Sequence, residues 1–167
     1  MNHILREGCV SAMEIRIMRS EDEPKAYSLI SESLDEYFAP QVITFFRMQW
    51  PAGQIVACDL FGNILCYLAG TKLPNGRVSI HLFATSAGNR GKGIGTMVLN
   101  RFKQAALMEG FTSIQLEVKE HNTRAMEFYK RNGFVPVEFL ESFYNDGSSG
   151  VRMVCDLNDR RSFSAQT

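Results

Sequence analysis

Apolar residues recur along the chain at two spacings, which divide it into strands and helices. Residues 14–19 alternate polar and apolar positions, as expected of a strand at or next to a sheet edge. The apolar positions after them, with Ser20 and Glu23 as a capping box, predict a helix through Leu34. The same analysis predicts later strands at 54–59, 64–71, 77–85, 112–118, 134–138 and 151–156.

Two further helices are predicted in the second half. Residues 94–109 carry apolar side chains near one face and stop at Gly110, and Asn122 caps a short helix that ends at Asn132-Gly133. The residues assigned to the apolar face of the longer helix are Met97, Val98, Phe102, Ala105 and Met108. The aromatic-rich stretch 37–50 fits a short helix or a loop. Strands with interspersed helices predict an α/β or α+β sheet covered on both faces.

Length and composition fit one globular domain, assigned to residues 13–157. The chain has 167 residues, 45% hydrophobic and 22% charged, and its 18 basic side chains balance 18 acidic ones. This balance argues against binding nucleic acid through bulk charge. Residues 1–12 are interpreted as a flexible extension or the product of an early start codon, and 158–167 as a solvated tail. No membrane span or secretory signal is predicted.

Four cysteines, Cys9, Cys58, Cys66 and Cys155, form no C-x-x-C pair and lie far from the three histidines in sequence. They predict neither a metal site nor a disulfide framework. We interpret them as reduced thiols, mostly in the core of a cytoplasmic protein.

The segment Asn89-Arg90-Gly91-Lys92-Gly93-Ile94-Gly95-Thr96 joins a predicted strand to a predicted helix. Glycines allow close approach of a ligand, and a helix start offers amides that bind phosphate. A Walker loop would need Ser or Thr after Lys92, and a dinucleotide loop would need glycine where Val98 stands. The R-x-x-G-x-G pattern that holds the pyrophosphate of coenzyme A fits. A turn without a ligand is one alternative, and a dinucleotide loop is a weaker one, because Glu117 lies at a suitable distance in sequence for a ribose contact.

The chain resembles the GCN5-related N-acetyltransferase (GNAT) superfamily. The glycine loop is similar to its acetyl-CoA loop. Its second signature is matched by Leu116-Glu117-Val118, Asn122, Ala125, Phe128-Tyr129 and Asn132-Gly133-Phe134. Within the superfamily the chain is most similar to the RimI and Ard1 group, which acetylates protein N-termini. That similarity rests on Trp50-Pro51, on Leu34-Asp35-Glu36-Tyr37 and on Phe143-Tyr144-Asn145-Asp146-Gly147.

Two positions depart from the family pattern. Ala87 and Asn89 stand where the family usually has proline and an aromatic residue before the glycine loop. Ser148-Ser149-Gly150 follows Gly147, where the RimI and Ard1 group often carries acidic residues. The resemblance still implies the GNAT fold: a mixed, mostly antiparallel, twisted sheet with helices on both faces and a splay between the fourth and fifth strands.

The resemblance also implies where the cofactor and the acceptor bind. The strand end at residues 83–85 would pair with the pantetheine arm of acetyl-CoA, and Glu36, Tyr37 and Tyr144 would line the acceptor groove. The implied cofactor residues are Phe83, Ala84, Thr85, Arg90, Gly91, Lys92, Gly93, Ile94, Gly95, Thr96, Asn122 and Tyr129.

Two residues are candidates for acid–base chemistry. Tyr129 shares a helix face with Ala125 and would protonate the departing thiolate, with a core aromatic as its alternative role. Glu117 points away from the row Ile114, Leu116 and Val118 and would act as the base through a water, with a solvent-facing carboxylate as the alternative. His81 is a rival base.

The expected activity is acetylation of the α-amine of a protein or peptide by direct transfer in a ternary complex. An α-amine, with a pKa of roughly 7.7–8.0, is already partly neutral near pH 7, so a weak base suffices. The alternatives are acetylation of a small amine, such as a polyamine, amino sugar or antibiotic, and a silent acyl-CoA-binding regulator. A ribosome or auxiliary subunit as partner is left open, as is a monomer or homodimer.

Overall fold

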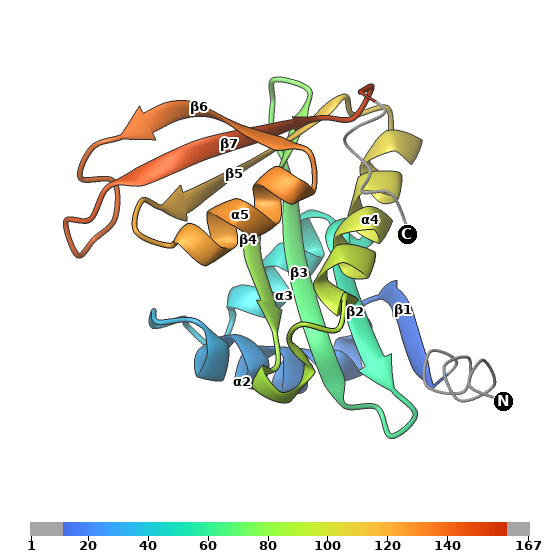
Figure 1. Cartoon of the computed structure of the whole chain (residues 1–167). Helices are drawn as coiled ribbons and strands as arrows, with labels where there is room; N and C mark the ends of the chain where they lie inside the picture. The colour runs from blue at the N-terminus through green and yellow to red at the C-terminus, as the bar shows by residue number, and fades with distance from the viewer. Residues whose placement is uncertain (1–11, 160–167) are drawn as a thin grey trace, which may run out of the picture. The chain divides into compact units, whose positions relative to one another are not determined.

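The computed structural model describes residues 12–159, so Cys9 and most of the predicted extension and tail lie outside the described part (Figure 1). Strands and helices follow the predicted order, and the stretch 37–50 contains a helix. The elements are β1 (Met13–Ile17), α2 (Glu23–Ser33), α3 (Val42–Gln49), β2 (Gln54–Asp59), β3 (Ile64–Lys72), β4 (Arg77–Thr85), α4 (Ile94–Met108), β5 (Ser113–Lys119), α5 (Thr123–Arg131), β6 (Phe134–Leu140) and β7 (Gly150–Asp156). No helix among residues 12–159 combines the length and apolarity needed to cross a membrane.

The strands of the described residues form a mixed sheet in the order β1-β2-β3-β4-β5-β7-β6. The β1–β2, β2–β3, β5–β7 and β6–β7 pairs are antiparallel, while β4 and β5 are parallel. The parallel ladder runs from the Arg77–Ser113 pair to the Ser79–Gln115 pair, although β4 continues to Thr85 and β5 to Lys119. This partial ladder agrees with the splay expected of a GNAT fold, and the predicted mixed, mostly antiparallel sheet is confirmed.

The described chain forms two compact units. The first unit contains residues 12–70 and Leu82–Phe102, and the second contains Thr71–His81 and 103–159. β4 and α4 are therefore each divided between the units. The units are treated separately below.

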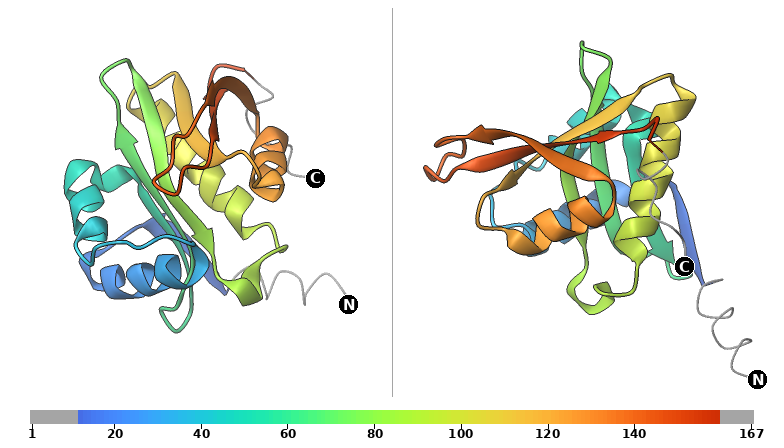
Figure 2. Two further views of the ribbon diagram at one scale, coloured as in Figure 1. Left: turned by 90° about the vertical axis from the view of Figure 1, so that its left-hand side faces the viewer. Right: turned by 45° about the horizontal axis from the view of Figure 1, so that its top comes forward.

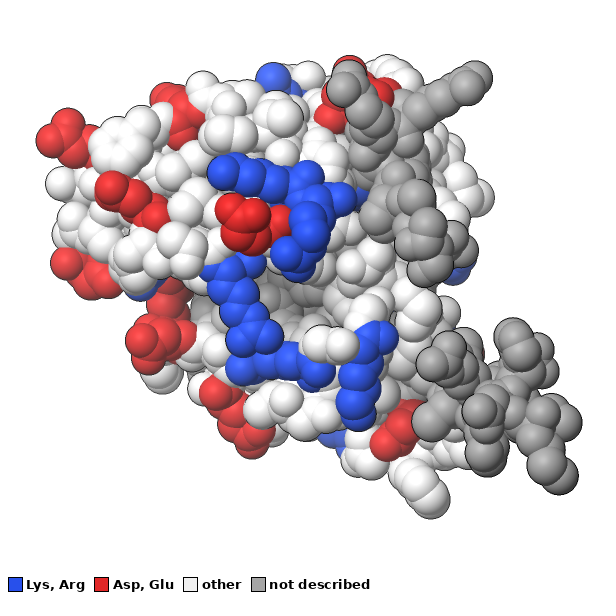
Figure 3. Space-filling model, viewed as in Figure 1, with Lys and Arg blue, Asp and Glu red and all other residues white. Residues whose placement is uncertain are grey.

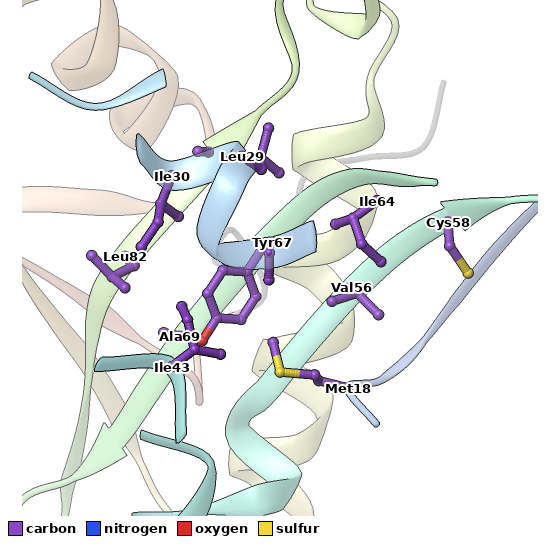
Figure 4. Packing of buried hydrophobic residues seen from close by; sticks show 12 residues of the cluster. Met18, Leu29, Ile30, Ile43, Val56, Cys58, Ile64, Tyr67, Ala69 and Leu82 are labelled. Carbon is purple, nitrogen blue, oxygen red and sulfur yellow. The ribbon is translucent and has the colours of Figure 1, made fainter. Parts of the chain in front are cut away.

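In the first unit, α2 and α3 pack on one side of β2 and β3, and the first part of α4 lies on the other side (Figure 2). Ile30 of α2 and Ile43 of α3 meet Tyr67 of β3 in a buried cluster, which Val56 of β2 extends (Figure 4). β2 and β3 are buried along almost their whole length, and alternate residues such as Val56 and Cys58, or Tyr67 and Ala69, face this cluster. The two helices cover this apolar face of the sheet.

On the α4 side, two glycines allow close packing of aromatic rings. A Cβ on Gly53 would lie 2.2 Å from the Trp50 ring, and a Cβ on Gly70 would lie 2.3 Å from the Phe102 ring. The Trp50 and Phe102 rings meet edge to face at 5.6 Å. Any larger residue at these glycines would displace a ring that helps to hold α4 on the sheet.

Two local expectations were wrong. Val98 and Phe102 are buried as predicted, but Met108 is 87% exposed and Leu99, Lys103 and Ala106 are buried, so the buried stripe of α4 is rotated from the predicted one. The capping box of Ser20 and Glu23 is also absent from the first turn before α2.

The carboxylate that organises the turn before α2 is Asp22 instead. Asp22 accepts the Arg19 backbone N–H at 2.8 Å and pairs with the Arg16 guanidinium at 2.6 Å. Glu23 instead accepts hydrogen bonds from Thr44 and Arg47 and so ties α2 to α3. The hydrogen bond from Arg16 lowers the pKa of Asp22, which keeps this nearly buried carboxylate ionised.

In the second unit, β5 has one buried face and one polar face. Ile114, Leu116 and Val118 are buried, while Ser113, Gln115 and Glu117 are partly exposed, as the alternation predicted. The Asn122 side chain accepts the Ala125 N–H at 3.2 Å and caps α5, which confirms its predicted capping role.

Candidate functional site

The glycine loop of the first unit depends on two left-handed residues. Gly91 and Gly93 have φ angles of 74° and 81°, a region that residues with a Cβ adopt at a cost. A Cβ at either position would have no heavy atom within 4 Å. The glycines are thus needed for backbone conformation, and the space above the loop is open.

This loop leads into the N-terminus of α4. The Met97 N–H donates to the Gly93 carbonyl at 3.2 Å, which is the first i to i−4 bond of the helix. Helix geometry therefore leaves the preceding amides, those of Ile94, Gly95 and Thr96, without an intrahelical acceptor. Such amides, together with the helix dipole, favour an anion.

Arg90 links the loop to the end of β4. Its Nε donates to the Thr85 carbonyl at 3.1 Å, so two predicted cofactor segments, 83–85 and 90–96, are brought together. Arg90 and Lys92 are both exposed and add positive charge. At the departure from the family pattern, Asn89 Nδ2 donates to Ser86 Oγ at 2.8 Å and braces the turn that precedes the loop.

These features fit a diphosphate such as that of coenzyme A. Open space, amides without an intrahelical acceptor and two cationic side chains occur together at the N-terminus of α4, a helix of 15 residues. Gly91 to Thr96 would hold the diphosphate, and Arg90 and Lys92 would balance its charge. The roles of the individual residues stay predictions.

In the second unit, Glu117 belongs to a hydrogen-bonded group that we name the Glu117 network: Gln115, Glu117, Glu138 and Arg152. Glu117 Oε1 accepts from Arg152 Nε at 3.0 Å and from Gln115 Nε2 at 3.1 Å. Arg152 also pairs with Glu138. The hydrogen bond with Glu117 raises the pKa of Arg152, so the guanidinium is a permanent cation beside the carboxylate. Glu117 is a partnered, largely buried carboxylate, with 18% of its side chain exposed.

His81, the rival base, lies in the second unit and is held by a hydroxyl. Its Nε2 is 2.7 Å from Thr71 Oγ1. Desolvation of the ring lowers the pKa of His81, and the negative charge of Glu117 acts in the opposite direction. A neutral imidazole is therefore favoured, which leaves His81 as a candidate proton acceptor.

Tyr129 sits near the end of α5, in a well-supported position. Its ring meets the Phe128 and Phe134 rings edge to face, each at 5.4 Å. Its carbonyl accepts the Asn132 N–H at 3.0 Å, and the Asn132 carbonyl in turn accepts from Lys103 Nζ at 2.5 Å. The side chain of Tyr129 is half-buried, so a core role and a catalytic role remain compatible with its burial.

The three predicted acceptor residues differ in their surroundings. Tyr144 packs against Gly150, where a Cβ would lie 2.9 Å from the ring, and Lys119 Nζ lies 5.3 Å from its centroid. Glu36 and Tyr37 lie in the exposed segment between α2 and α3, and within residues 12–159 neither forms a hydrogen bond or ion pair through its side chain.

The serines that replace the acidic residues of the RimI and Ard1 group shape the β6–β7 connection. Tyr144 N–H donates to the Ser148 carbonyl, and Ser149 Oγ accepts the Ser142 N–H. Ser148 also donates to Asp146, and hydrogen bonds from Ser148 lower the pKa of Asp146. The departure therefore has a structural role in holding the loop that carries Tyr144.

Basic side chains also gather over α5 on the face shown in Figure 3. Arg124, Lys130 and Arg131 are all exposed on this helix, with Glu127 as the acidic residue among them. The formal net charge of zero for the whole sequence does not reveal this local positive charge.

Residues 15–134 match the pattern shared by the acetyltransferase (GNAT) family. The chain belongs to this family. It is therefore an acetyltransferase, and its acyl donor is acetyl-CoA, as predicted.

Known proteins support the same assignment. The chain is 31% identical over 132 residues to N-alpha-acetyltransferase 30 of Schizosaccharomyces pombe, an alignment that covers 75% of this chain and 86% of the relative. Its structure is similar to that of Ard1 from Thermoplasma volcanium, with a TM-score of 0.84, 28% identity and coverage of 89% of this chain and 99% of the other.

The fold also resembles the ribosomal-protein-S18-alanine N-acetyltransferase of Escherichia coli. The TM-score is 0.78 at 15% identity, over 88% of this chain and 95% of the other. The predicted similarity to the RimI and Ard1 group is thus confirmed.

Sequence reasoning missed two residues that support the candidate site. Arg152 stands opposite Glu117 only because β5 and β7 pair in a register that joins residues 35 positions apart. Lys103 appeared to be one more polar position on a helix, yet it is buried under the end of α5. Both positions become informative only when the strand register or the helix contact is known.

Proposed function

We propose that this protein transfers an acetyl group from acetyl-CoA to the N-terminal α-amine of a protein or peptide, by direct transfer in a ternary complex. The similarity to an N-alpha-acetyltransferase over most of both chains supports this acceptor. This relative and the acid–base chemistry of the acceptor favour an α-amine over a small free amine or a lysine.

The observation that carries the proposal is the ion pair on Glu117. The hydrogen bonds from a guanidinium and an amide hold the Glu117 carboxylate in a fixed position. An α-amine has a pKa of roughly 7.7–8.0, so about a tenth or more is neutral near pH 7, whereas a lysine amine, at roughly 10.4, is almost entirely charged. A carboxylate that acts through a water therefore has less deprotonation to achieve for an α-amine than for a lysine.

The proposed roles follow from these contacts. Acetyl-CoA supplies an activated acyl group on a thiol leaving group. Glu117 takes a proton from the acceptor amine through a water, and the phenol of Tyr129 gives a proton to the departing sulfur. Because attack joins two bound reactants, the largest contribution is expected from orienting the amine.

The cytoplasmic location predicted from the cysteines belongs to this proposal. Cys58, Cys66 and Cys155 are buried free thiols, and burial raises the pKa of Cys66 to about 11. Unreactive core thiols of this kind are typical of proteins in reducing compartments. Contact with a ribosome or an auxiliary subunit remains a prediction.

A competition between acceptors tests the proposed function. Purified protein and acetyl-CoA are combined with a panel of peptides that have free N-termini and one internal lysine, and with spermidine and an amino sugar. The same peptides with blocked N-termini are the matched control. We expect mass spectrometry to place the acetyl group on the α-amine and to find blocked peptides unmodified. A higher kcat/KM for spermidine or the sugar than for every peptide would contradict the proposal.

A further inference from the structure

An open pocket of about 520 Å³ lies on the second unit, beside the turn between β3 and β4. Apolar side chains of the turn, Leu73 and Pro74, form part of its wall, and Arg77, Gln115, Glu138 and Arg152 supply the polar part. Neither Glu117 nor Tyr129, the residues proposed to transfer protons, lines this pocket, so the pocket calls for its own explanation.

The two arginines that line the pocket differ in their ion pairs. Arg152 is paired with both Glu117 and Glu138. Arg77 has one long hydrogen bond, from Nη1 to Gln115 Oε1 at 3.4 Å, and no ion pair with any residue of 12–159. The half-buried Arg77 guanidinium can donate further hydrogen bonds, and it lies next to apolar side chains. It is therefore suited to bind a carboxylate on a short aliphatic stem.

The pocket wall is joined to the candidate base. Gln115 lies between Arg77 and Glu117 and hydrogen-bonds to both. Arg77 is in register with Ser113, four residues before Glu117 on β5. At about 3.3 Å per residue, the backbones of Arg77 and Glu117 are roughly 13 Å apart along the sheet, while their side chains are linked through Gln115. An extended polypeptide that ran along β5 with its amine at Glu117 would place its fifth residue beside the Arg77 backbone.

We propose that this pocket is a subsite for a carboxylate group, bound by Arg77. Its source is an acidic side chain near the fifth residue of the acceptor or a free small carboxylate. The first source rests on the proposed function, and the second does not. Glu138 lines the same pocket and opposes anion binding there, although its pairing with Arg152 offsets part of its charge.

Paired peptides test the first source. Two acceptors that differ only by Glu or Gln at position five are compared with wild-type protein, Arg77→Gln and Glu138→Gln. Arg101→Gln, which changes an exposed arginine of α4, is the matched control. We expect the Glu peptide to have about fivefold higher kcat/KM with wild-type protein and Arg101→Gln, as for one partly exposed ion pair. The preference should disappear in Arg77→Gln and increase in Glu138→Gln.

Glutarate tests the second source. Its binding is followed by NMR titration of wild-type protein and Arg77→Gln, with no peptide or acetyl-CoA present. Weak glutarate binding that requires Arg77 supports the subsite. If no peptide is acetylated, only the proposed function is overturned. Equal rates for the two peptides together with no Arg77-dependent glutarate binding would overturn the subsite. A preference that persists in Arg77→Gln would also overturn it, and circular dichroism would show that this variant is folded.

Discussion

The two regions assigned to acetyl transfer are built in different ways. In the first unit the loop before α4 offers mainly backbone: left-handed glycines, orphan amides and open space. In the second unit the proposed catalytic residues Glu117 and Tyr129 would act through side chains, and each is held by contacts with residues distant in sequence. The loop is therefore specified by a short motif, while the second region is specified by the packing of several elements.

This difference determines what each region tolerates. A backbone site accepts many side chains but few changes of φ, so glycine positions should be the sensitive ones. A side-chain site depends on individual functional groups, so an isosteric change that removes one hydroxyl or one charge should be enough to disable it.

The largest effect is expected from removing the phenol of the second region. Tyr129→Phe keeps both ring contacts but loses the proton donor, so kcat should fall about 100-fold while KM for acetyl-CoA changes little. Steady-state kinetics with a peptide acceptor measures both constants. Phe128→Leu, on the neighbouring residue, is the control and should lower stability more than kcat. An unchanged kcat in Tyr129→Phe would remove this residue from the mechanism.

A smaller effect is expected from the backbone region. Gly93→Ala places a Cβ at a φ of 81°, which costs about 1–2 kcal/mol and should raise the Kd for acetyl-CoA about tenfold with little change in kcat. Gly93→Asn should be milder because asparagine tolerates this conformation better. Calorimetric titration with acetyl-CoA measures the affinity.

The matched control for the loop is Gly88→Ala. Gly88 is not among the glycines of positive φ, and a Cβ there would have no neighbour within 4 Å. Its affinity for acetyl-CoA should equal that of the wild type. If Gly88→Ala weakened binding as much as Gly93→Ala, the conformational explanation would be wrong.

The same contrast explains how far the sequence alone could predict the molecule. The strand at 77–85 and the glycine loop depend on local patterns, and the strand was predicted with its observed bounds. Asp22, rather than the predicted pair Ser20 and Glu23, organises the turn before α2 through its contact with Arg16 of β1, which is an interaction between elements. The partners of Glu117 likewise require the β5–β7 register, which no local pattern contains.

The smallest expected effect is on stability and concerns Lys103, which contacts the end of the helix that carries Tyr129. It is fully buried, and its ammonium donates to the Asn132 carbonyl at the end of the helix that carries Tyr129. Lys103→Met leaves this carbonyl without its donor, at a cost of about 1 kcal/mol at pH 7 after relief of the buried charge. Lys130→Met, on the exposed face of α5, is the control and should be neutral.

The pH dependence of this loss distinguishes support from simple packing. Burial lowers the pKa of Lys103 from its ordinary 10.5, so the unfolded chain binds the proton more tightly than the folded protein. Wild-type stability therefore gains from this residue as pH rises from the folded-state pKa toward 10.5, and Lys103→Met lacks that gain. Urea unfolding should show a larger loss at pH 9.5 than at pH 7. An equal loss at both values would mean that burial does not shift the pKa of Lys103, and the loss would then come from packing and from the hydrogen bond to Asn132.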